Sequence, residues 1–469
     1  MEKNFFTGSI QSEFYFKVNF ECFICLEVES GKSCATLLSN LDFKKGLFEE
    51  FLKKAEKELN TIKSMMTIKS VGSASFLREV KSRIEGIKFK DEKLVQRDEK
   101  FEVVYYPNEG KLRVSKEEEK KVDNKIVNVL IVDDSKTIRN LLTKVLSKSE
   151  KINVVATAEK PSDVEELIRK HKPDVITLDI HMPEMNGVEL LKIIQPKYKI
   201  PAIMITSVSI EEGPLVLDAL ESGAFDYIQK PKIEELSIVG PLMVEKVLEA
   251  SKFKSNRRSS SSIINRSKNI FNQDCTIVIG SSTGGTTALK DILCGLPSNI
   301  PPTLIVQHIP AVFSKAFADR LNSLCPFTVT EACDGDVVKN NHVYIAPGGQ
   351  QMKIKGRGDK KVIQITDDAP VNRFKPSVDY MFQSFESVTA KENIIAVILT
   401  GMGKDGAAGI KKLKDLGALT IAQSEESCVV FGMPKEAIAL GGASEVVHKE
   451  NIAEKMVEFS QSFKREQAS

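Results

Sequence analysis

The middle of the chain alternates between short apolar runs and longer stretches whose apolar residues recur every three or four positions. Four of the apolar runs end in polar residues: VNVLIVDDS (127–135), DVITLDIHMP (174–183), PAIMITS (201–207) and FDYIQKP (225–231). After the first run, Ser135 can cap a helix whose apolar face holds Ile138, Leu141, Leu142, Val145 and Leu146. Apolar strands that alternate with amphipathic helices predict an α/β domain with a parallel sheet covered on both faces.

The C-terminal part of the chain repeats this kind of pattern. Its strand candidates lie in DCTIVIGSSTGG (274–285), TLIVQHIP (303–310), HVYIAPGG (342–349), AVILTGMGKDGAAG (396–409) and TIAQSEESCVVFGMP (420–434). We therefore predict a second α/β domain with a mostly parallel sheet. In open parallel sheets, functional groups gather at the carboxyl ends of the strands.

The N-terminal part is patterned differently. Phe23 and Ile24, between two cysteines, fit a buried strand, and residues 44–64 fit an amphipathic helix. MMTIKSVGSASF (65–76) indicates a strand followed by a glycine turn, and EKFEVVYYPNEGKLRV (99–114) indicates a hairpin around Asn108–Gly110. These elements predict a small α/β or α+β domain.

Two polar stretches separate the three patterns. SKEEEKKVDNK (115–125) is charged and lacks an apolar face, which is typical of a linker. SKFKSNRRSSSSIINRSK (251–268) carries six basic and no acidic residues around a serine run, and its composition favours a flexible tether over a surface for anionic partners. The predicted domains span 1–115, 126–247 and 274–465, with a flexible linker at 248–273.

Composition narrows the class of protein. A chain of 469 residues with 42% hydrophobic content suits about three domains. A net charge of +2, with both signs mixed along the chain, argues against a nucleic-acid partner. The N-terminus lacks the pattern of a signal peptide, and no apolar run approaches the ~20 residues that cross a bilayer. Eight cysteines form no dense framework, so we expect a cytoplasmic protein without membrane insertion.

Polar residues follow each strand of the middle domain and should meet at one edge of its sheet. They are Asp133, Asp134, Asp179, Thr206 and Lys230. Three carboxylates that close repel one another unless a cation joins them, and all-oxygen ligation suits Mg²⁺. A lysine and a hydroxyl beside them can hold the oxygens of a phosphoryl group. The alternative is that each aspartate merely caps a helix or turn.

These residues make the middle domain resemble the response-regulator receiver domain over its whole length, which implies a flavodoxin-like fold. The resemblance implies that Asp179 is the phosphoacceptor. It implies that Asp134 and Asp179, with Asp133 through water, bind the Mg²⁺ needed for phosphorylation, together with the main-chain carbonyl of His181.

The same resemblance implies roles for three more residues. Thr206 and Lys230 contact the phosphoryl group, and Tyr227 stands at the switch aromatic position. The phosphodonor would be the histidine kinase of the pathway that the receiver serves.

The loop after the first C-terminal strand, GSSTGG, could cradle a phosphate or present a serine. It lacks the second glycine of a dinucleotide fingerprint, and Thr286 follows Gly285 where a P-loop has lysine. A serine nucleophile needs a base and an orienting carboxylate. His308 and Asp405 both follow apolar strands at the same predicted edge as Ser282. A competing base, His342, precedes its strand, and spacing alone leaves His308 open between a catalytic and a structural role.

The last ~190 residues resemble the catalytic domain of the chemotaxis protein-glutamate methylesterases (CheB). The matching segments are IGSSTGGTTAL, QHIP, PVNRFKPSVD, LTGMGKDGAAG and CVVFGMP. The resemblance implies that Ser282 is the nucleophile, His308 the general base and acid, and Asp405 the orienting carboxylate. The main-chain N–H of Met402 would be the oxyanion donor. Ser281 and Thr283 are alternative hydroxyls beside Ser282.

This resemblance implies the function as well. The protein would hydrolyse glutamate methyl esters on methylated chemoreceptors, and also deamidate glutamines, giving adaptation in bacterial chemotaxis. Ester hydrolysis would need no cofactor. Two other classes stay open: a receiver-controlled binding protein with an inert hydrolase domain, and a transcription regulator, which would need a basic helix-turn-helix after residue 250.

The N-terminal domain faintly resembles the chemoreceptor glutamine deamidases (CheD). Cys22 falls near the nucleophile of that family and Gly72–Ala74 near its G-G-A, but Ala35 stands where the family has histidine. A cysteine without its base is a poor deamidase. A zinc site at Cys22, Cys25 and Cys34 would need a fourth ligand, which is not nearby. We expect a degenerate deamidase-like domain that docks to receptors.

Overall fold

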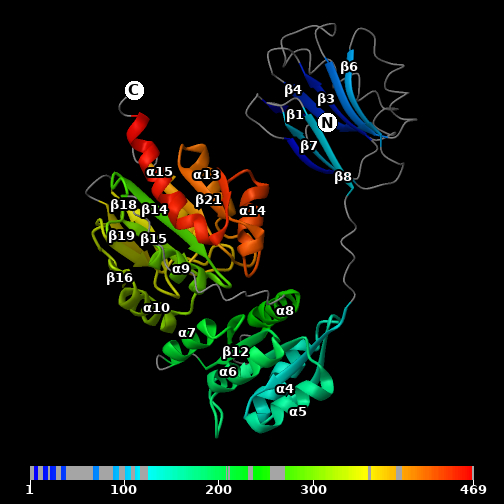
Figure 1. The fold of residues 1–469 in the computed structure, drawn as a ribbon, viewed down its shortest axis with the longest axis vertical. Helices are drawn as coiled ribbons and strands as arrows, with labels where there is room; N and C mark the ends of the chain where they lie inside the picture. Colours follow the sequence, from blue (N-terminus) through cyan, green and yellow to red (C-terminus); the bar gives the residue numbers. More distant parts are fainter. Residues whose placement is uncertain are drawn as a thin grey trace. The chain divides into compact units, whose positions relative to one another are not determined.

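The computed structural model divides the chain into two compact units, residues 1–124 and 125–469 (Figure 1). It describes the backbone of eight N-terminal strands, and residues 125–466 apart from 208, 210–211, 231–235, 254–269, 357–360 and 387–392. The helix predicted over 44–64 lies outside the described residues. None of the helices in the described part is long and apolar enough to span a membrane.

The described strands of the N-terminal unit form two sheets. Its strands are β1 (Phe5–Gly8), β2 (Phe14–Val18), β3 (Cys22–Glu27), β4 (Ser33–Leu38), β5 (Thr67–Gly72), β6 (Lys88–Leu94), β7 (Phe101–Tyr106) and β8 (Lys111–Lys116). One sheet has the order β1-β4-β3-β5-β6 and the other the order β2-β7-β8. The strand predicted around Phe23 is β3, and the predicted hairpin is the antiparallel pair β7 and β8. In the backbone register, Ala35 lies opposite Cys25 and Gly72 opposite Cys22.

The second unit begins with a five-stranded parallel sheet in the order β10-β9-β11-β12-β13. Its elements are β9 (Val127–Val132), α4 (Lys136–Leu146), β10 (Ile152–Ala158), α5 (Pro161–His171), β11 (Val175–Asp179), α6 (Gly187–Tyr198), β12 (Ala202–Thr206), α7 (Gly213–Glu221), β13 (Asp226–Gln229) and α8 (Leu236–Lys252). This strand order is that of flavodoxin-like folds, so the predicted fold is confirmed. Ser135 stands at the N-cap of α4, but its side chain makes no capping hydrogen bond.

A seven-stranded sheet in the order β16-β17-β15-β14-β20-β21-β22 follows, and all of its strand pairs are parallel, as predicted. Its strands are β14 (Cys275–Ser281), β15 (Thr303–Gln307), β16 (Thr328–Glu331), β17 (His342–Ile345), β20 (Asn393–Ile398), β21 (Leu419–Gln423) and β22 (Glu445–Val447). An antiparallel hairpin of β18 (Gln351–Lys355) and β19 (Val362–Thr366) accompanies this sheet.

Helices cover both faces of the larger sheet. They are α9 (Gly285–Cys294), α10 (Ala311–Leu324), α11 (Val378–Ser384), α13 (Ala407–Asp415), α14 (Met433–Ala439) and α15 (Ile452–Glu466), with short 3₁₀ turns η6 (Glu425–Ser427) and η7 (Lys449–Asn451). Successive residues of β14 pack into different clusters: Ile277 and Ile279 join α9, α10 and α15, and Val278 joins α11, α13 and α14. Burial on both faces explains why β14 is a continuous apolar run instead of an alternating one.

Side chains around the smaller sheet also pack against side chains around the larger sheet. Tyr227 of β13 meets Phe313 of α10 edge to face, with ring centroids 5.6 Å apart. Met402 and Val430, from loops beside the larger sheet, share an apolar cluster with Met243 and Val247 of α8. The receiver-like part therefore packs directly on the C-terminal edge of the larger sheet.

Candidate active site and phosphorylation site

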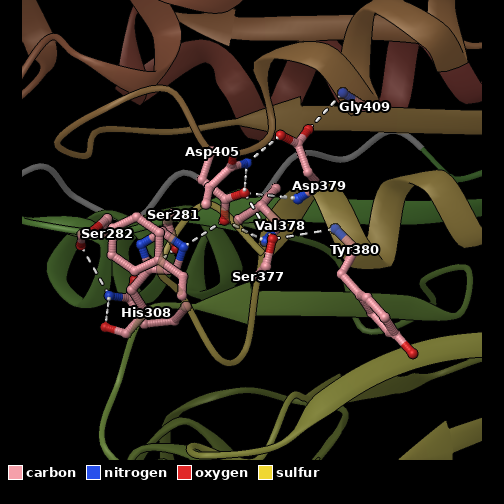
Figure 2. Close-up of polar contacts among 12 residues, drawn as sticks. Ser281, Ser282, His308, Ser377, Val378, Asp379, Tyr380, Asp405 and Gly409 are labelled. Carbon is pink, nitrogen blue, oxygen red and sulfur yellow. Dashed lines mark hydrogen bonds and ion pairs between the residues drawn. The ribbon is translucent and has the colours of Figure 1, made fainter. Parts of the chain in front are cut away.

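Three loops at the carboxyl ends of neighbouring strands bring the predicted triad together. Ser282 follows β14, His308 follows β15, and Asp405 lies in the loop between β20 and α13. The amide of Gln307 donates to the main-chain oxygens of both Ser282 and His308, at 3.0 and 3.1 Å. These bonds fix the serine loop and the histidine loop side by side (Figure 2).

His308 is held firmly on one side and left open on the other. Its Nε2 lies 2.8 Å from Oδ2 of Asp405, and its ring stacks on Phe374 with centroids 3.7 Å apart. The other ring nitrogen, Nδ1, is buried and has no hydrogen-bond partner among the residues that the structure describes. An ionised Asp405 favours a proton on Nε2, which leaves Nδ1 as the basic atom.

Asp405 is a fully buried carboxylate surrounded by donors. Besides His308, it accepts hydrogen bonds from Asn372 Nδ2 at 2.8 Å, Ser377 Oγ at 2.8 Å and the main-chain N–H of Val378 at 2.7 Å (Figure 2). Burial by itself would raise the pKa of Asp405. The hydrogen bond and positive charge of His308, together with the hydrogen bonds from Asn372 and Ser377, outweigh the effect of burial and lower the pKa. The carboxylate is thus kept ionised without contact with water.

A second buried carboxyl supports the first. Asp379 accepts from Asn372 Nδ2 at 2.7 Å and from the main-chain N–H of Gly409. Burial raises the pKa of Asp379. Asn372 therefore bridges two carboxyl groups and fixes Asp405 through both.

The alternative hydroxyls and the alternative base are engaged elsewhere. Ser281 is buried and its Oγ donates to Gln307, while Thr283 donates to Asp226 of β13. His342 starts β17 at the other edge of the sheet, bonded to Thr330 through Nε2. Ser282, between Ser281 and Thr283 in the chain, is half-buried and takes part in neither of the hydrogen bonds that engage those two residues.

The loop that carries Met402 lies against the serine. A Cβ on Gly401 would lie 2.7 Å from the Cβ of Ser282, so this close approach needs glycine. Gly401 is fixed by its N–H donating to Val430 and its carbonyl accepting from Met433. The N–H of Met402 takes part in none of these loop bonds, as an oxyanion donor requires.

The second predicted site lies at the same kind of edge on the smaller sheet. One carboxylate oxygen each from Asp133, Asp134 and Asp179 lie within 4.8 Å of one another, a donor set that fits Mg²⁺. Lys230 reaches Asp179 at 2.8 Å and Asp133 at 3.2 Å. Burial raises the pKa of Asp179 to about 6, because the nearby Asp133 adds to burial and the Lys230 bond only partly offsets both.

The remaining predicted residues of this site point elsewhere. Thr206 and Ser207 both donate to the buried carboxylate of Glu212. The exposed side chain of His181 also turns to Glu212, with Nε2 3.0 Å from Oε1, so it is not directed at the acidic cluster. Tyr227 is buried against Phe313, as described above.

Several residues of these sites were missed from sequence. They are Asn372, Ser377, Asp379, Gln307, Glu212 and Asp226. Asn372, Ser377 and Asp379 lie within PVNRFKPSVD, a segment without an obvious strand or helix, and that irregularity was the available signal. Glu212 and Asp226 act on partners that only the tertiary structure reveals.

Comparison with known proteins identifies two families that match the chain. Residues 129–238 match the response regulator receiver domain and residues 277–456 match the CheB methylesterase domain. The chain is similar to the protein-glutamate methylesterase/protein-glutamine glutaminase of Bordetella bronchiseptica, at 43% identity over 71% of this chain and 97% of the relative. The corresponding protein of Pectobacterium atrosepticum is 41% identical over 71% and 96%. The Thermotoga maritima CheB methylesterase catalytic domain is 44% identical, covering 39% of this chain and 97% of that domain, with a TM-score of 0.38.

Proposed function

The chain belongs to the family of CheB methylesterases, and on that premise we propose that it is a phosphorylation-regulated protein-glutamate methylesterase of bacterial chemotaxis. Its substrates would be glutamate methyl esters on chemoreceptors, with glutamine side chains as a second substrate, and it would act in the cytoplasm. The observation that carries this proposal is the buried His308–Asp405 pair beside Ser282, in which Nδ1 of His308 has no hydrogen-bond partner within the described part of the chain.

In the proposed first step, Ser282 Oγ attacks the ester carbonyl carbon while Nδ1 of His308 takes the hydroxyl proton. Asp405 stabilises the imidazolium through Nε2–H. The carbon–oxygen bond to the methoxy group then breaks, and His308 returns the proton so that methanol leaves. Water, activated by the same Nδ1, attacks the acyl-serine, releasing glutamate and restoring Ser282.

The negative charge that develops on the carbonyl oxygen needs a donor. We assign the main-chain N–H of Met402, because Gly401 brings this loop against Ser282. A glutamine amide would pass through the same steps with ammonia as the leaving group. No step in this scheme is assigned to a metal or cofactor.

The receiver part would act as the switch. A receiver domain uses Mg²⁺ in its phosphorylation, and we assign the ion to Asp133, Asp134 and Asp179, with the main-chain carbonyl of His181. Asp179 would accept the phosphoryl group from a histidine kinase. Lys230 already lies at Asp179, whereas Thr206 would have to leave Glu212 to reach a phosphoryl oxygen.

We further propose that the docked receiver inhibits the enzyme. Asp226 of β13 accepts from Thr283, next to the nucleophile, at 2.6 Å and from Lys246 of α8 at 2.7 Å. The side chain of Met402 lies in the apolar cluster formed with α8. Docking therefore places β13 against the serine loop and α8 against the oxyanion loop. Phosphorylation would shift Tyr227 on β13 and bias the receiver away from this arrangement.

We propose that the N-terminal unit is a receptor-docking relative of the deamidases. We also keep 1–115, 126–247 and 274–465 as the proposed domains, but helix α8 continues to Lys252, so a flexible linker would begin after that residue and not at 248. An isolated 1–115 fragment should show no amidase activity, because Ala35 replaces the family's histidine. Deamidation of receptor glutamines by that fragment, abolished in Cys22→Ala, would contradict this assignment.

Methanol release from methylated receptors tests the proposed function. The full chain with a small phosphodonor and Mg²⁺ should release methanol, and Ser282→Ala should not. Full activity in Ser282→Ala would move the nucleophile to Ser281 or Thr283. Receptor binding without any methanol release would favour an inert, receiver-controlled binding protein.

A further inference from the structure

A strained turn lies directly beside the catalytic histidine. Val371 and Phe374 exchange two main-chain hydrogen bonds, Val371 N–H to Phe374 O at 3.1 Å and Phe374 N–H to Val371 O at 2.9 Å. The two residues between them, Asn372 and Arg373, both have positive φ, 53° and 74°. This is the pattern of a type I′ turn, which favours Asn followed by Gly.

Asn372 suits the backbone conformation of its position in this turn, whereas Arg373 does not. Asparagine tolerates the left-handed region, and the Asn372 side chain binds Asp405 and Asp379. At the second position glycine would adopt the same conformation without strain, so arginine carries a conformational cost. Backbone strain of this kind gathers at functional sites, which directs attention to what the Arg373 side chain does.

Arg373 is exposed to solvent. Its chain neighbour Phe374 stacks on His308, so the guanidinium begins from a backbone next to the catalytic ring. Within the described part of the chain, no carboxylate forms an ion pair with Arg373 or with the exposed Lys404, which adjoins Asp405. Two acids a few positions earlier in the chain already have lysine partners: Asp367 pairs with Lys375, and Asp368 with Lys353.

We propose that Arg373 is a specificity-determining residue that binds a carboxylate of the receptor segment flanking the target ester. This inference rests on the proposed esterase function. A guanidinium binds carboxylates in a bidentate manner, and the exposed Lys404, next to Asp405 in the chain, adds a second positive charge. Because hydrolysis converts neutral esters into glutamates, a segment with several target sites gains the charges that Arg373 recognises as reaction proceeds.

Two synthetic peptides test the proposal. Both carry one glutamate γ-methyl ester, flanked by glutamates in one peptide and by alanines in the other. Methanol release is measured with the full chain in the presence of a phosphodonor and Mg²⁺. In Arg373→Gly, we expect kcat/KM for the acidic peptide to fall about tenfold, mainly through KM, and kcat/KM for the neutral peptide to stay within about twofold.

Stability and salt separate this role from a structural one. Arg373→Gly should not lower Tm, because glycine suits the left-handed position. High salt should remove the wild-type preference for the acidic peptide, since exposed charges are screened. Arg373→Lys should retain part of the preference. Lys172→Gly is the matched control, because Lys172 is an exposed cation with φ 46° at the end of α5, far along the chain from the triad.

An equal loss on both peptides would show that Arg373 only supports the turn, and unchanged kcat/KM on both would show that it does not contact the substrate. Either result overturns the assignment while leaving the esterase function intact. Absence of methanol release by the wild-type chain from both peptides and from methylated receptor would contradict the proposed function itself, and this inference with it.

Discussion

Asp179 and Asp405 both lie at the carboxyl edge of a parallel sheet, yet their surroundings have opposite effects on ionisation. Both aspartates are buried. Burial raises the pKa of Asp179 to about 6, with Asp133 adding to the effect. For Asp405, burial is outweighed by hydrogen bonds from His308, Asn372 and Ser377, and its pKa is lowered.

The difference lies in how completely hydrogen-bond donors and positive charges within the protein balance each carboxylate. Asp405 has its donors within the protein, so it can orient His308 permanently without further partners. Asp179 shares Lys230 with Asp133 and lies in a cluster of three carboxylates. Lys230 alone does not balance these negative charges, so the cluster is suited to binding a cation. Under the proposed function, one edge would be a catalytic site complete within the protein, and the other would be a site that Mg²⁺ and a phosphoryl group complete.

The largest effect should come from breaking the catalytic edge. Ser282→Ala and His308→Ala should each lower kcat by about 10³-fold or more, and the double variant should be little worse than either, because triad members act as a unit. Initial rates of methanol release measure this. Additive losses, or a double variant far slower than the singles, would mean that the two residues do not act in one step.

The next effect concerns the contact between the two edges. Asp226→Ala removes the acceptor for Thr283 and Lys246, so the activity of the unphosphorylated chain should rise several-fold, and removal of residues 1–273 should raise it by tens-fold. A tens-fold change corresponds to about 2 kcal/mol of docking free energy. Asp163→Ala, on the distant helix α5, is the control. A truncated enzyme no faster than the unphosphorylated whole would show that docking is not inhibitory.

A smaller effect should follow from making Asp405 more like Asp179. Ser377→Ala removes one donor to Asp405, which should raise the pKa of that carboxyl and lower kcat about tenfold. The acid limb of the pH–rate profile should move to higher pH. Ser377 also caps α11, so Tm should fall slightly, but loss of a cap alone would leave the pH profile unmoved. An unshifted profile would mean that Asp405 does not depend on this donor.

The smallest effect is the pH dependence of Mg²⁺ binding. A raised pKa in the folded state means that ionising Asp179 costs stability as pH rises from its ordinary value of 3.8 to about 6. Mg²⁺ needs the ionised form, so its stabilising effect should be weak at pH 5 and amount to a few degrees of Tm at pH 7.5. Asp179→Asn should lose most of it. A Tm increment from Mg²⁺ that is equal at pH 5 and pH 7.5 would argue against a proton competing at Asp179.

The sequence allowed prediction of what lies at strand ends, and little beyond them. Ser282, His308 and Asp405 each follow an apolar strand, so the topology of a parallel sheet was enough to bring their loops to one edge. The strand β10 was not singled out, because its partly exposed residues form no continuous apolar run. The hairpin of β18 and β19 was also missed, because it is an antiparallel pair outside the parallel sheet.

Residues that act through tertiary contacts were beyond sequence reasoning. Asn372 serves Asp405 only because a turn 33 positions earlier in the chain folds onto the loop after β20. Asp226 accepts a hydrogen bond from Thr283, which lies 57 positions later in the chain, and no local sequence pattern predicts this pair. Hydrogen-bond partners far apart in the chain have no periodicity, so spacing arguments do not reach them.

The central claim is that the Asp179 site controls chemistry at the Ser282 site, and one measurement addresses it directly. Methanol release from methylated receptor is followed for the full chain and for Asp179→Ala, each with and without a small phosphodonor and Mg²⁺. The account predicts a tens-fold rise in the wild type on adding the phosphodonor, and no rise in Asp179→Ala. An equal rise in both proteins, or none in the wild type while the enzyme stays active, would contradict it.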